Sequence, residues 1–309
     1  MAGGKPYVGR FAPSPTGPLH LGSLYTALAS YLDARAHRGR WLLRIDDIDT
    51  PRNVPGSVDS ILTTLEAYGL YWDGPVYYES EHPADYEQAL SELQRPGLLY
   101  PCTCSRKTLA ERPGRHDIYP GICRNRTVFP TDRPYALRVK SDGRDIGFDD
   151  RLQGSIRQNL AEEHGDFILK RKEGIMSYQF ACVIDDHLQG VTHVVRGFDL
   201  VDSTPKQIYL QQLLGLPRPS YLHVPIIIDS HGCKLSKQTL AEAVTMRNTS
   251  AVMFRLLELL KQEPPVGLRD ASCSEMLEWA VRNWNPEPLI KIHAIQPEMI
   301  EESVDSGEG

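Results

Sequence analysis

A histidine and two small residues, His20, Gly22 and Ser23, stand where a loop rich in proline and glycine gives way to leucines at helical spacing. The first N–H groups of a helix have no partner within the helix, and the helix dipole is positive at that end, so the position suits an anion. Gly22 lets a backbone approach a nucleotide closely, and His20 can donate a hydrogen bond to a phosphate oxygen. The segment predicts a phosphate site; the alternative is an ordinary helix start with a surface histidine.

A second polar segment, Lys234-Leu-Ser-Lys237-Gln, follows an apolar strand predicted at 221–228. Two lysine charges close together could form a second phosphate site. Taken alone, two lysines around a serine also fit a solvated loop. The position of the segment, late in the chain and after the second half of an α/β pattern, favours the phosphate site.

Charged and polar residues also stand at the ends of predicted strands. Arg10 ends the first strand beside Ser14, Asp46 ends the next, and Arg196 ends a later one, while Tyr178 begins a predicted helix. An amino acid with a carboxylate side chain needs a fixed cation for that carboxylate and an acid for its ammonium group. Because strand ends meet in one crevice of a parallel sheet, these residues could share a pocket. The alternative for each arginine is a surface ion pair, and for the tyrosine a place in the core.

Three of the six cysteines, Cys102, Cys104 and Cys123, fall within one short segment. Three thiolates favour a tetrahedral zinc ion, which needs a fourth ligand from nearby. By ligand chemistry alone, His116 is the orthodox candidate. A closed site of this kind predicts a structural role, and the alternative is a set of unrelated cysteines.

The elements that must position these residues form an α/β pattern. A strand at 7–11, a helix carrying Leu21 to Leu32 and a strand at 41–45 make a parallel βαβ unit. The middle of the chain, 102–160, lacks long periodicity and is expected to be an insertion with short strands such as 135–139. After the insertion we expect, in order, a strand at 167–171, a helix at 178–184, a strand at 192–196, a helix capped by Thr204, a strand at 221–228 and two amphipathic helices.

Three stretches resemble the glutamyl branch of class I aminoacyl-tRNA synthetases. RFAPSPTGPLHLGS, at 10–23, resembles its first signature, with HLGS in place of the "HIGH" motif and Ser23 as a tolerated departure. DDHLQGVTHVVRGFDL, at 185–200, followed by TPKQ, resembles the second signature. KLSKQ stands late in the chain, as the "KMSKS" loop of these enzymes does. The resemblance covers about 7–238.

The resemblance implies a role for each matching residue. The ATP site would comprise His20, Gly22, Ser23 and Lys237, with His20, Lys237 and Lys234 catalytic and Mg²⁺ accompanying the nucleotide. L-Glutamate would be bound by Arg10, Ser14, Asp46, Tyr178 and Arg196. The branch usually has Glu at the position of Asp46, so the shorter side chain would need a shifted backbone or a water to reach the ammonium group.

The resemblance also implies an α/β fold with a Rossmann-like catalytic domain, a parallel sheet and an inserted zinc subdomain. In chain order we expect the first catalytic half at 1–100, the zinc-binding insertion at 101–165, the second catalytic half with the KLSKQ loop at 166–240, a helical C-terminal segment at 241–300 and a disordered tail at 301–309.

Only about seventy residues follow the KLSKQ loop, too few for the large anticodon-binding domain of a glutamyl-tRNA synthetase. The chain therefore resembles the shorter glutamyl-queuosine tRNA(Asp) synthetases, in which the pattern CTC…IYxGxCR makes Tyr119 the fourth zinc ligand. Such enzymes form glutamyl-AMP without tRNA and transfer the glutamate to queuosine at the wobble position of tRNA(Asp). The alternatives are a truncated glutamyl-tRNA synthetase that charges the tRNA 3′ end, and an inactive RNA-binding paralogue, which Asp46 would favour.

The formal net charge of −6 excludes a surface that attracts nucleic acid everywhere, so an RNA partner needs a local basic patch. Arginines of the insertion could form this patch or simply a solvated loop: Arg106, Arg112, Arg115, Arg124 and Arg126. No long apolar segment or apolar N-terminal stretch is present, which predicts a cytoplasmic protein without a membrane partner. We expect it to act as a monomer.

Overall fold

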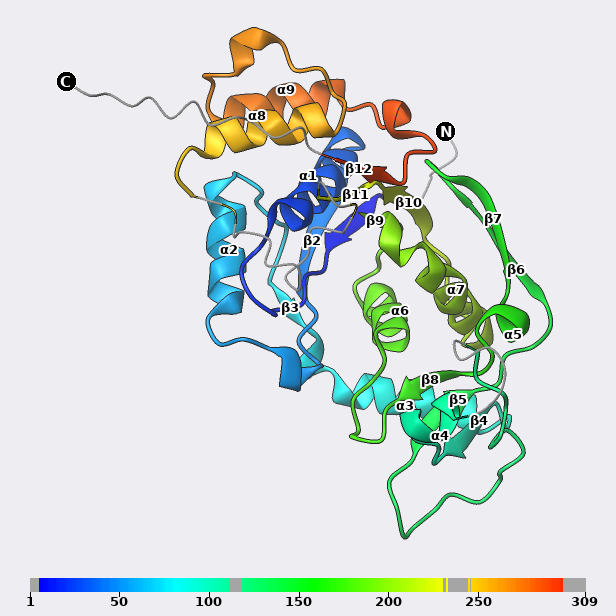
Figure 1. Ribbon diagram of the computed structural model, residues 1–309. Coiled ribbons are helices and arrows are strands. Elements are labelled where there is room, and N and C mark those ends of the chain that lie inside the picture. Colours follow the sequence, from blue (N-terminus) through cyan, green and yellow to red (C-terminus); the bar gives the residue numbers. More distant parts are fainter. Residues whose placement is uncertain (1–5, 112–117, 230–231, 233–243, 245, 297–309) are drawn as a thin grey trace.

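The computed structural model describes residues 6–111, 118–229, 232, 244 and 246–296 (Figure 1). Its central layer consists of strands β1 (Val8–Phe11), β2 (Arg40–Ile45), β3 (Tyr77–Tyr78), β9 (His193–Gly197) and β10 (Ser220–Val224). Strands β1, β2 and β3 pair in parallel, as do β9 and β10. The two groups meet where the Thr192 N–H donates to the Val8 carbonyl oxygen at 2.9 Å. The resulting order β3-β2-β1-β9-β10 confirms the predicted parallel sheet.

Helices surround this layer: α1 (Leu21–Ala36), α2 (Ser57–Ala67), α6 (Tyr178–Leu188) and α7 (Thr204–Leu213). Helix α1 begins at the predicted place, with His20 as its N-cap residue. Its leucines 24, 28 and 32 are fully buried in the core together with Trp41 of β2. Apolar residues at this spacing form one stripe along a helix, so burial of the stripe fixes α1 against the sheet.

A second, smaller sheet is antiparallel and has the order β4-β5-β8. Its strands are β4 (Leu99–Cys102), β5 (Ala136–Val139) and β8 (Phe167–Lys170). The sequence pattern placed the last of these strands in the resumed α/β alternation. This was wrong, because β8 pairs with β5 and lies at the lower end of the molecule in Figure 1, apart from the parallel layer. A four-residue apolar run indicates a strand but does not indicate which sheet the strand joins.

Helices α3 (Pro83–Gln94), α4 (Arg106–Ala110) and α5 (Leu160–Glu163) belong to the same region of the chain. Strands β6 (Asp145–Asp150) and β7 (Gly154–Asn159) form an antiparallel hairpin whose first strand also pairs with β10. The middle segment therefore contributes both to the small sheet and to the edge of the parallel layer. That 101–165 forms a separate domain stays a prediction.

The strand predicted at 221–228 is interrupted by Pro225, which lacks the N–H needed to continue the ladder. It continues as β11 (Ile226–Ile227), paired with β12 (Ala294–Ile295). Helix α7 has Ser203 as its N-cap residue, so Thr204, predicted as the cap, is instead its first helical residue. The tail predicted at 301–309 lies outside the described residues.

The C-terminal region contains α8 (Thr249–Leu259) and α9 (Cys273–Asn283), both predicted from their periodicity. Their buried residues join the core cluster of α1 and β2, so they extend that core in space (Figure 1). In the part of the chain that the structure describes, no helix has the length and apolar character needed to cross a membrane.

Asp33 on α1 is hydrogen-bonded to side chains from three other segments of the chain. Its carboxylate accepts hydrogen bonds from the Tyr7 hydroxyl at 2.5 Å and from two Arg151 nitrogens at 2.6 and 2.9 Å. The indole N–H of Trp284 donates to it at 2.9 Å. Burial alone would raise the pKa of Asp33, but the Arg151, Tyr7 and Trp284 hydrogen bonds lower it below its usual value.

We predict that Asp33→Asn lowers the free energy of unfolding by about 3 kcal/mol at pH 7, because Arg151 loses its charged partner. A carboxyl whose pKa is lowered by folding stabilises the fold above about pH 4 and loses this effect as the pH falls through its folded-state pKa. Urea unfolding at several pH values measures the difference, which should shrink in acid. The exposed Asp270→Asn is the control, and an equal stability of the two variants would contradict the prediction.

Candidate active site and metal centre

A cavity of about 670 Å³ opens where β1 and β9 end and α1 begins. All the predicted ATP and amino-acid residues that the structure describes line it, except Asp46. They are Arg10, Ser14, His20, Gly22, Ser23, Tyr178 and Arg196. Residues up to 186 positions apart thus share one space, as expected for the ends of strands in a parallel sheet.

The helix entrance forms one wall of this cavity. The Ser23 N–H donates to Nδ1 of His20 at 3.2 Å, and the Ser23 hydroxyl lies 2.9 Å from Nε2. Because an amide N–H can only donate, Nδ1 accepts and Nε2 carries the ring proton. His20 is therefore a donor through Nε2, as a phosphate ligand requires, although this proton now faces the Ser23 hydroxyl.

Arg10 is buried and already has an anionic partner. Its Nε donates to Oδ1 of Asp186 at 3.1 Å. Arg44 of β2 donates to the same oxygen at 2.6 Å and, through Nε, to Oδ1 of Asp46 at 2.8 Å. Burial opposes ionisation of Asp186, but the charges of Arg10 and Arg44 outweigh it and lower its pKa to about 2. Two guanidinium groups and two carboxylates thus balance one another.

Asp46 is the one described residue of the predicted ATP and amino-acid set that does not line the cavity. It is 6% exposed. Its carboxylate is engaged by Arg44, and burial raises its pKa against the opposing effect of that arginine. A contact between Asp46 and a substrate ammonium group stays a prediction.

Arg196 lies on another wall and is 3% exposed. Its guanidinium donates to Oγ1 of Thr204 at 2.7 Å, to Nε2 of His223 at 3.1 Å, to the Tyr178 hydroxyl at 3.3 Å and to the Leu200 carbonyl at 3.4 Å. None of these partners is a carboxylate. Among the described residues Arg196 forms no ion pair, so its charge is available to an anion in the cavity.

Several residues of this region were not predicted from the sequence. Arg44 and His223 stand inside apolar strands, where the pattern indicates only burial. Asp186 stands in the DDHLQG stretch. It could have been predicted from the sequence, because it is an acid near the end of an amphipathic helix. Arg52 also lines the cavity, and its Nε pairs with Asp49 at 2.8 Å.

Lys234 and Lys237 lie outside the described residues. The described chain on either side of them is close to the cavity. Ile226 and Ile227 line it, and the Val244 N–H donates to the Leu19 carbonyl at 3.0 Å, next to His20. The described residues on both sides of the two lysines in sequence therefore lie near the cavity or near His20.

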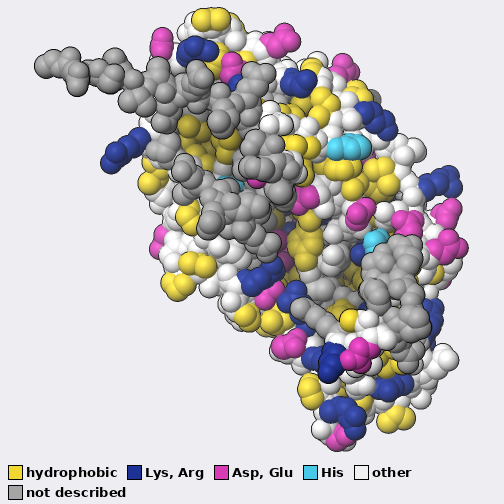
Figure 2. Space-filling model, viewed as in Figure 1, with side chains coloured by type: hydrophobic (Ala, Val, Ile, Leu, Met, Phe, Trp, Pro, Cys, Tyr) yellow, Lys and Arg dark blue, Asp and Glu magenta, His cyan; other side chains and the backbone are white. Residues whose placement is uncertain are grey.

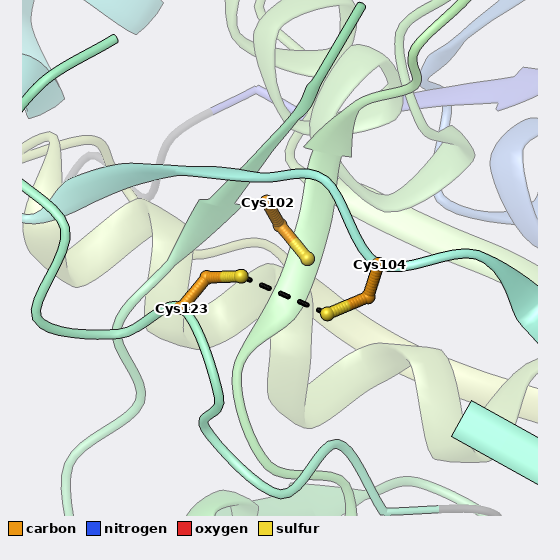
Figure 3. A group of neighbouring side chains, drawn as sticks. All are labelled: Cys102, Cys104 and Cys123. Atoms are coloured by element: carbon orange, nitrogen blue, oxygen red, sulfur yellow. Dashed lines mark hydrogen bonds between the residues drawn. The ribbon is translucent and has the colours of Figure 1, made fainter. Parts of the chain in front are cut away.

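The predicted cysteines form a cluster, with the thiol groups of Cys102, Cys104 and Cys123 turned toward one another (Figure 3). Their sulfur atoms lie within 4.8 Å of one another, the closest pair being Cys104 and Cys123 at 3.6 Å. The Tyr119 hydroxyl lies 3.4 Å from the sulfur of Cys102 and 3.9 Å from that of Cys104. Such a donor set could hold a soft metal ion. His116, the other candidate ligand, lies outside the described residues.

The electrostatics favour a thiolate at Cys102, whereas burial raises the pKa of Cys104 to about 11. Burial alone would raise the pKa of Cys102, but hydrogen bonds with Tyr119 and Arg138 lower it to about 7. The Arg138 guanidinium also lies 3.7 Å from the centre of the Tyr119 ring. A cation held against the ring supports negative charge at this place.

The arginines proposed as a basic patch are only partly described. Arg124 pairs with Asp166 and donates to the Ser141 carbonyl at 2.7 Å, and Arg126 donates to Oγ1 of Thr103 at 2.8 Å. On the face drawn in Figure 2, basic side chains are interspersed with acidic ones. These two arginines therefore have structural partners, and the basic patch stays a prediction.

Residues 7–261 match the family model of the catalytic domain of class I tRNA synthetases (E and Q). The chain belongs to this family. It is therefore a ligase-type enzyme of the class I synthetases, and the cavity at the helix entrance lies in the synthetase catalytic domain. The parallel sheet with its surrounding helices is the fold of that domain.

Curated relatives and solved structures agree with this family. Proteins named glutamyl-Q tRNA(Asp) synthetase from Ectopseudomonas mendocina and Thiobacillus denitrificans are 50% and 51% identical to the chain. The matches cover 90% and 91% of this chain and 93% and 94% of the relatives. The crystal structure of glutamate-tRNA synthetase from Elizabethkingia anophelis is similar with a TM-score of 0.79 at 27% identity, over 95% of this chain and 68% of that one.

We predict that Cys104→Ser abolishes metal binding by this synthetase, because the substitution replaces one soft ligand and opens the closed site. Elemental analysis of the purified protein should find about one metal ion per wild-type chain. Cys273→Ser is the matched control, since Cys273 is a free cysteine outside the cluster. Equal metal content in the two variants would contradict the assignment.

Proposed function

We propose that this chain activates L-glutamate with ATP to form glutamyl-AMP and transfers the glutamate to queuosine at the wobble position of tRNA(Asp). The names of relatives that share half of its residues over nine-tenths of its length support this substrate. The observation that carries the chemistry is the common cavity, in which the entrance of α1 and the uncompensated cation of Arg196 face one space. An anionic amino acid and a nucleotide phosphate need these two features together.

The phosphates of ATP would lie at the entrance of α1, against His20, Gly22 and Ser23. The free N–H groups and dipole of the helix favour the negative charge there. Activation joins a carboxylate oxygen of glutamate to the α-phosphorus of ATP, and pyrophosphate leaves with its electron pair. Lys237, assisted by Lys234, would stabilise the charge of that step, and Mg²⁺ would accompany the nucleotide.

Glutamate would lie deeper in the cavity. Arg196 would bind one carboxylate, with the Tyr178 hydroxyl 3.3 Å from its guanidinium completing the wall. Arg10 and Ser14 line the same space and would contact the rest of the amino acid. The acid required by the ammonium group would be Asp46, reached through a water because Asp46 does not itself line the cavity.

The metal would be one Zn²⁺ ion held by Cys102, Cys104, Cys123 and Tyr119. The three sulfurs and the phenol oxygen converge, which supports this set. Zinc bound in a closed site supplies no reactive position, so its contribution would be structural. It would join the end of β4 to the segment carrying Tyr119 and Cys123, a region whose own buried cluster contains little besides these residues.

We further propose that the enzyme works as a monomer in the cytoplasm, with the predicted organisation into two catalytic halves, a zinc-binding insertion and a helical C-terminal segment. The small sheet β4-β5-β8 supports the insertion as a structural unit, although its outer strands extend past both ends of 101–165.

The substrate proposal predicts that labelled glutamate is attached, in the presence of ATP, to tRNA(Asp) that contains queuosine and not to tRNA(Asp) from a strain that lacks it. The cyclopentenediol of queuosine supplies the accepting hydroxyl. Acid-precipitable label measures the transfer. Equal labelling of both tRNAs would instead indicate charging of the 3′ end, and the absence of any label together with no ATP–pyrophosphate exchange would indicate an inactive paralogue.

The role of the lysine segment predicts that Lys237→Ala lowers kcat of glutamate-dependent ATP–pyrophosphate exchange about 100-fold or more, because its charge acts mainly in the transition state. KM for glutamate should change little. Lys107→Ala, on α4 and away from the cavity lining, is the control. A loss of glutamate binding as large as the loss of kcat would contradict the assigned role.

A further inference from the structure

We propose that Asp150 and His223 are positioning residues, which hold the guanidinium of Arg196 in the orientation and charge state that bind a substrate carboxylate. The inference rests on the proposed function, since it concerns how the same cavity recognises glutamate. Neither residue lines the cavity. Both act through Arg196.

The three side chains form a buried row that runs from the β6–β7 hairpin to the cavity. Nδ1 of His223 lies 2.6 Å from Oδ2 of Asp150, and the Arg196 Nε donates to Nε2 of His223 at 3.1 Å. The side chains of Asp150 and His223 are completely inaccessible to solvent. These residues come from β6, β9 and β10, which are neighbours in the sheet, so the backbone fixes their spacing.

The hydrogen bonds determine the tautomer of His223. A guanidinium N–H can only donate, so Nε2 must accept from Arg196. Nδ1 then carries the ring proton and donates it to the Asp150 carboxylate. His223 is therefore neutral in this arrangement, and Asp150 is the residue that selects the tautomer with an acceptor toward Arg196.

Asp150 is itself held in place. Its Oδ1 accepts from the backbone N–H groups of Leu152 and Gln153 at 3.0 and 2.9 Å, and its Oδ2 accepts from the His223 N–H at 3.1 Å. Burial would raise the pKa of Asp150, but the His223 and backbone hydrogen bonds lower it. The carboxylate is thus ionised and has a fixed orientation.

The groups that face His223 come from five elements, and the Thr204 hydroxyl of α7 lies 3.1 Å from its Nε2. Burial and the charge of Arg196 on β9 lower its pKa, while Asp150 on β6 and Asp199 in the 3-10 helix Phe198–Ser203 oppose this, and the net shift is downward. The Tyr221 ring of β10 lies parallel to the imidazole, with centroids 6.1 Å apart. At neutral pH the imidazole is therefore the uncharged acceptor that the hydrogen bonds require.

Because the acceptor is neutral, the Arg196 guanidinium keeps a positive charge that a carboxylate would cancel. The His223 imidazole satisfies Nε of Arg196 without cancelling the positive charge, whereas an acid at this place would form an ion pair like that of Arg10 with Asp186. The Nη1 group, which reaches the Tyr178 hydroxyl at 3.3 Å, stays part of an unneutralised cation beside the cavity. The row Asp150–His223–Arg196 therefore favours a carboxylate over an uncharged side chain as the bound group.

The test compares the full-length variants His223→Leu and His223→Gln with wild type and with Tyr209→Phe. Leucine removes the acceptor, whereas the glutamine carbonyl can still accept from Arg196. Tyr209→Phe also removes one buried hydrogen bond, from its hydroxyl to the Lys140 carbonyl, but outside the row. Calorimetric titration with L-glutamate gives Kd, and ATP–pyrophosphate exchange gives KM for ATP.

We expect His223→Leu to raise Kd for L-glutamate about tenfold or more, as expected for loss of a hydrogen bond to a charged group, with KM for ATP unchanged. His223→Gln should recover most of the affinity, and Tyr209→Phe should bind as wild type. An unchanged Kd in His223→Leu would overturn the inference while leaving the proposed function intact. If His223→Leu does not fold, the test depends on His223→Gln. A Kd for L-glutamate in His223→Gln that is tenfold or more above that of Tyr209→Phe would then show that an acceptor at this position does not preserve binding, which would overturn the inference. Wild-type protein that binds no L-glutamate would overturn the proposed function itself.

Discussion

The charge of the cavity depends on which buried guanidinium groups are paired with a carboxylate. Removing such a charge from water costs several kcal/mol unless a partner compensates for it. Arg10 and Arg44 receive that compensation from Asp186, whereas Arg196 has only uncharged partners. The two sides of one space therefore differ in charge, although an arginine stands on each. An anion that enters would compensate the charge of Arg196, so in the proposed function this asymmetry favours an acidic amino acid.

Helix α1 links this site to the stability of the fold. Its first residues line the cavity, its leucines occupy the main core, and Asp33 near its end is bound by Tyr7, Arg151 and Trp284. The position of His20 is therefore set by packing along the whole helix and not by the loop that precedes it. A helix anchored at its far end can present its first N–H groups to a ligand without rearrangement, which reduces the entropic cost of binding.

The sequence predicted elements that have a strong local signal. The leucine stripe and the Pro/Gly loop identified α1 and its entrance, and the cysteine spacing identified the cluster of Cys102, Cys104 and Cys123. Arg44 and His223 could not be found in this way, because a charged or polar residue inside an apolar strand gives no indication of its partner. Their partners, Asp186 and Asp150, are 142 and 73 positions away. The pairing of β8 with β5 was missed for the same reason, since sheet membership depends on contacts distant in sequence.

The same reasoning explains where Asp46 lies. Asp46, Arg44, Asp186 and Arg10 form a row of alternating charge from β2 through α6 to β1. Each member compensates for its neighbours, so Asp46 holds Arg44 in place and Arg44 in turn shares Asp186 with Arg10. A carboxylate committed to Arg44 has less freedom to reach a ligand in the cavity. Replacing Asp46 by a neutral residue would leave Arg44 and Arg10 to share Asp186, the one acid of this row that remains.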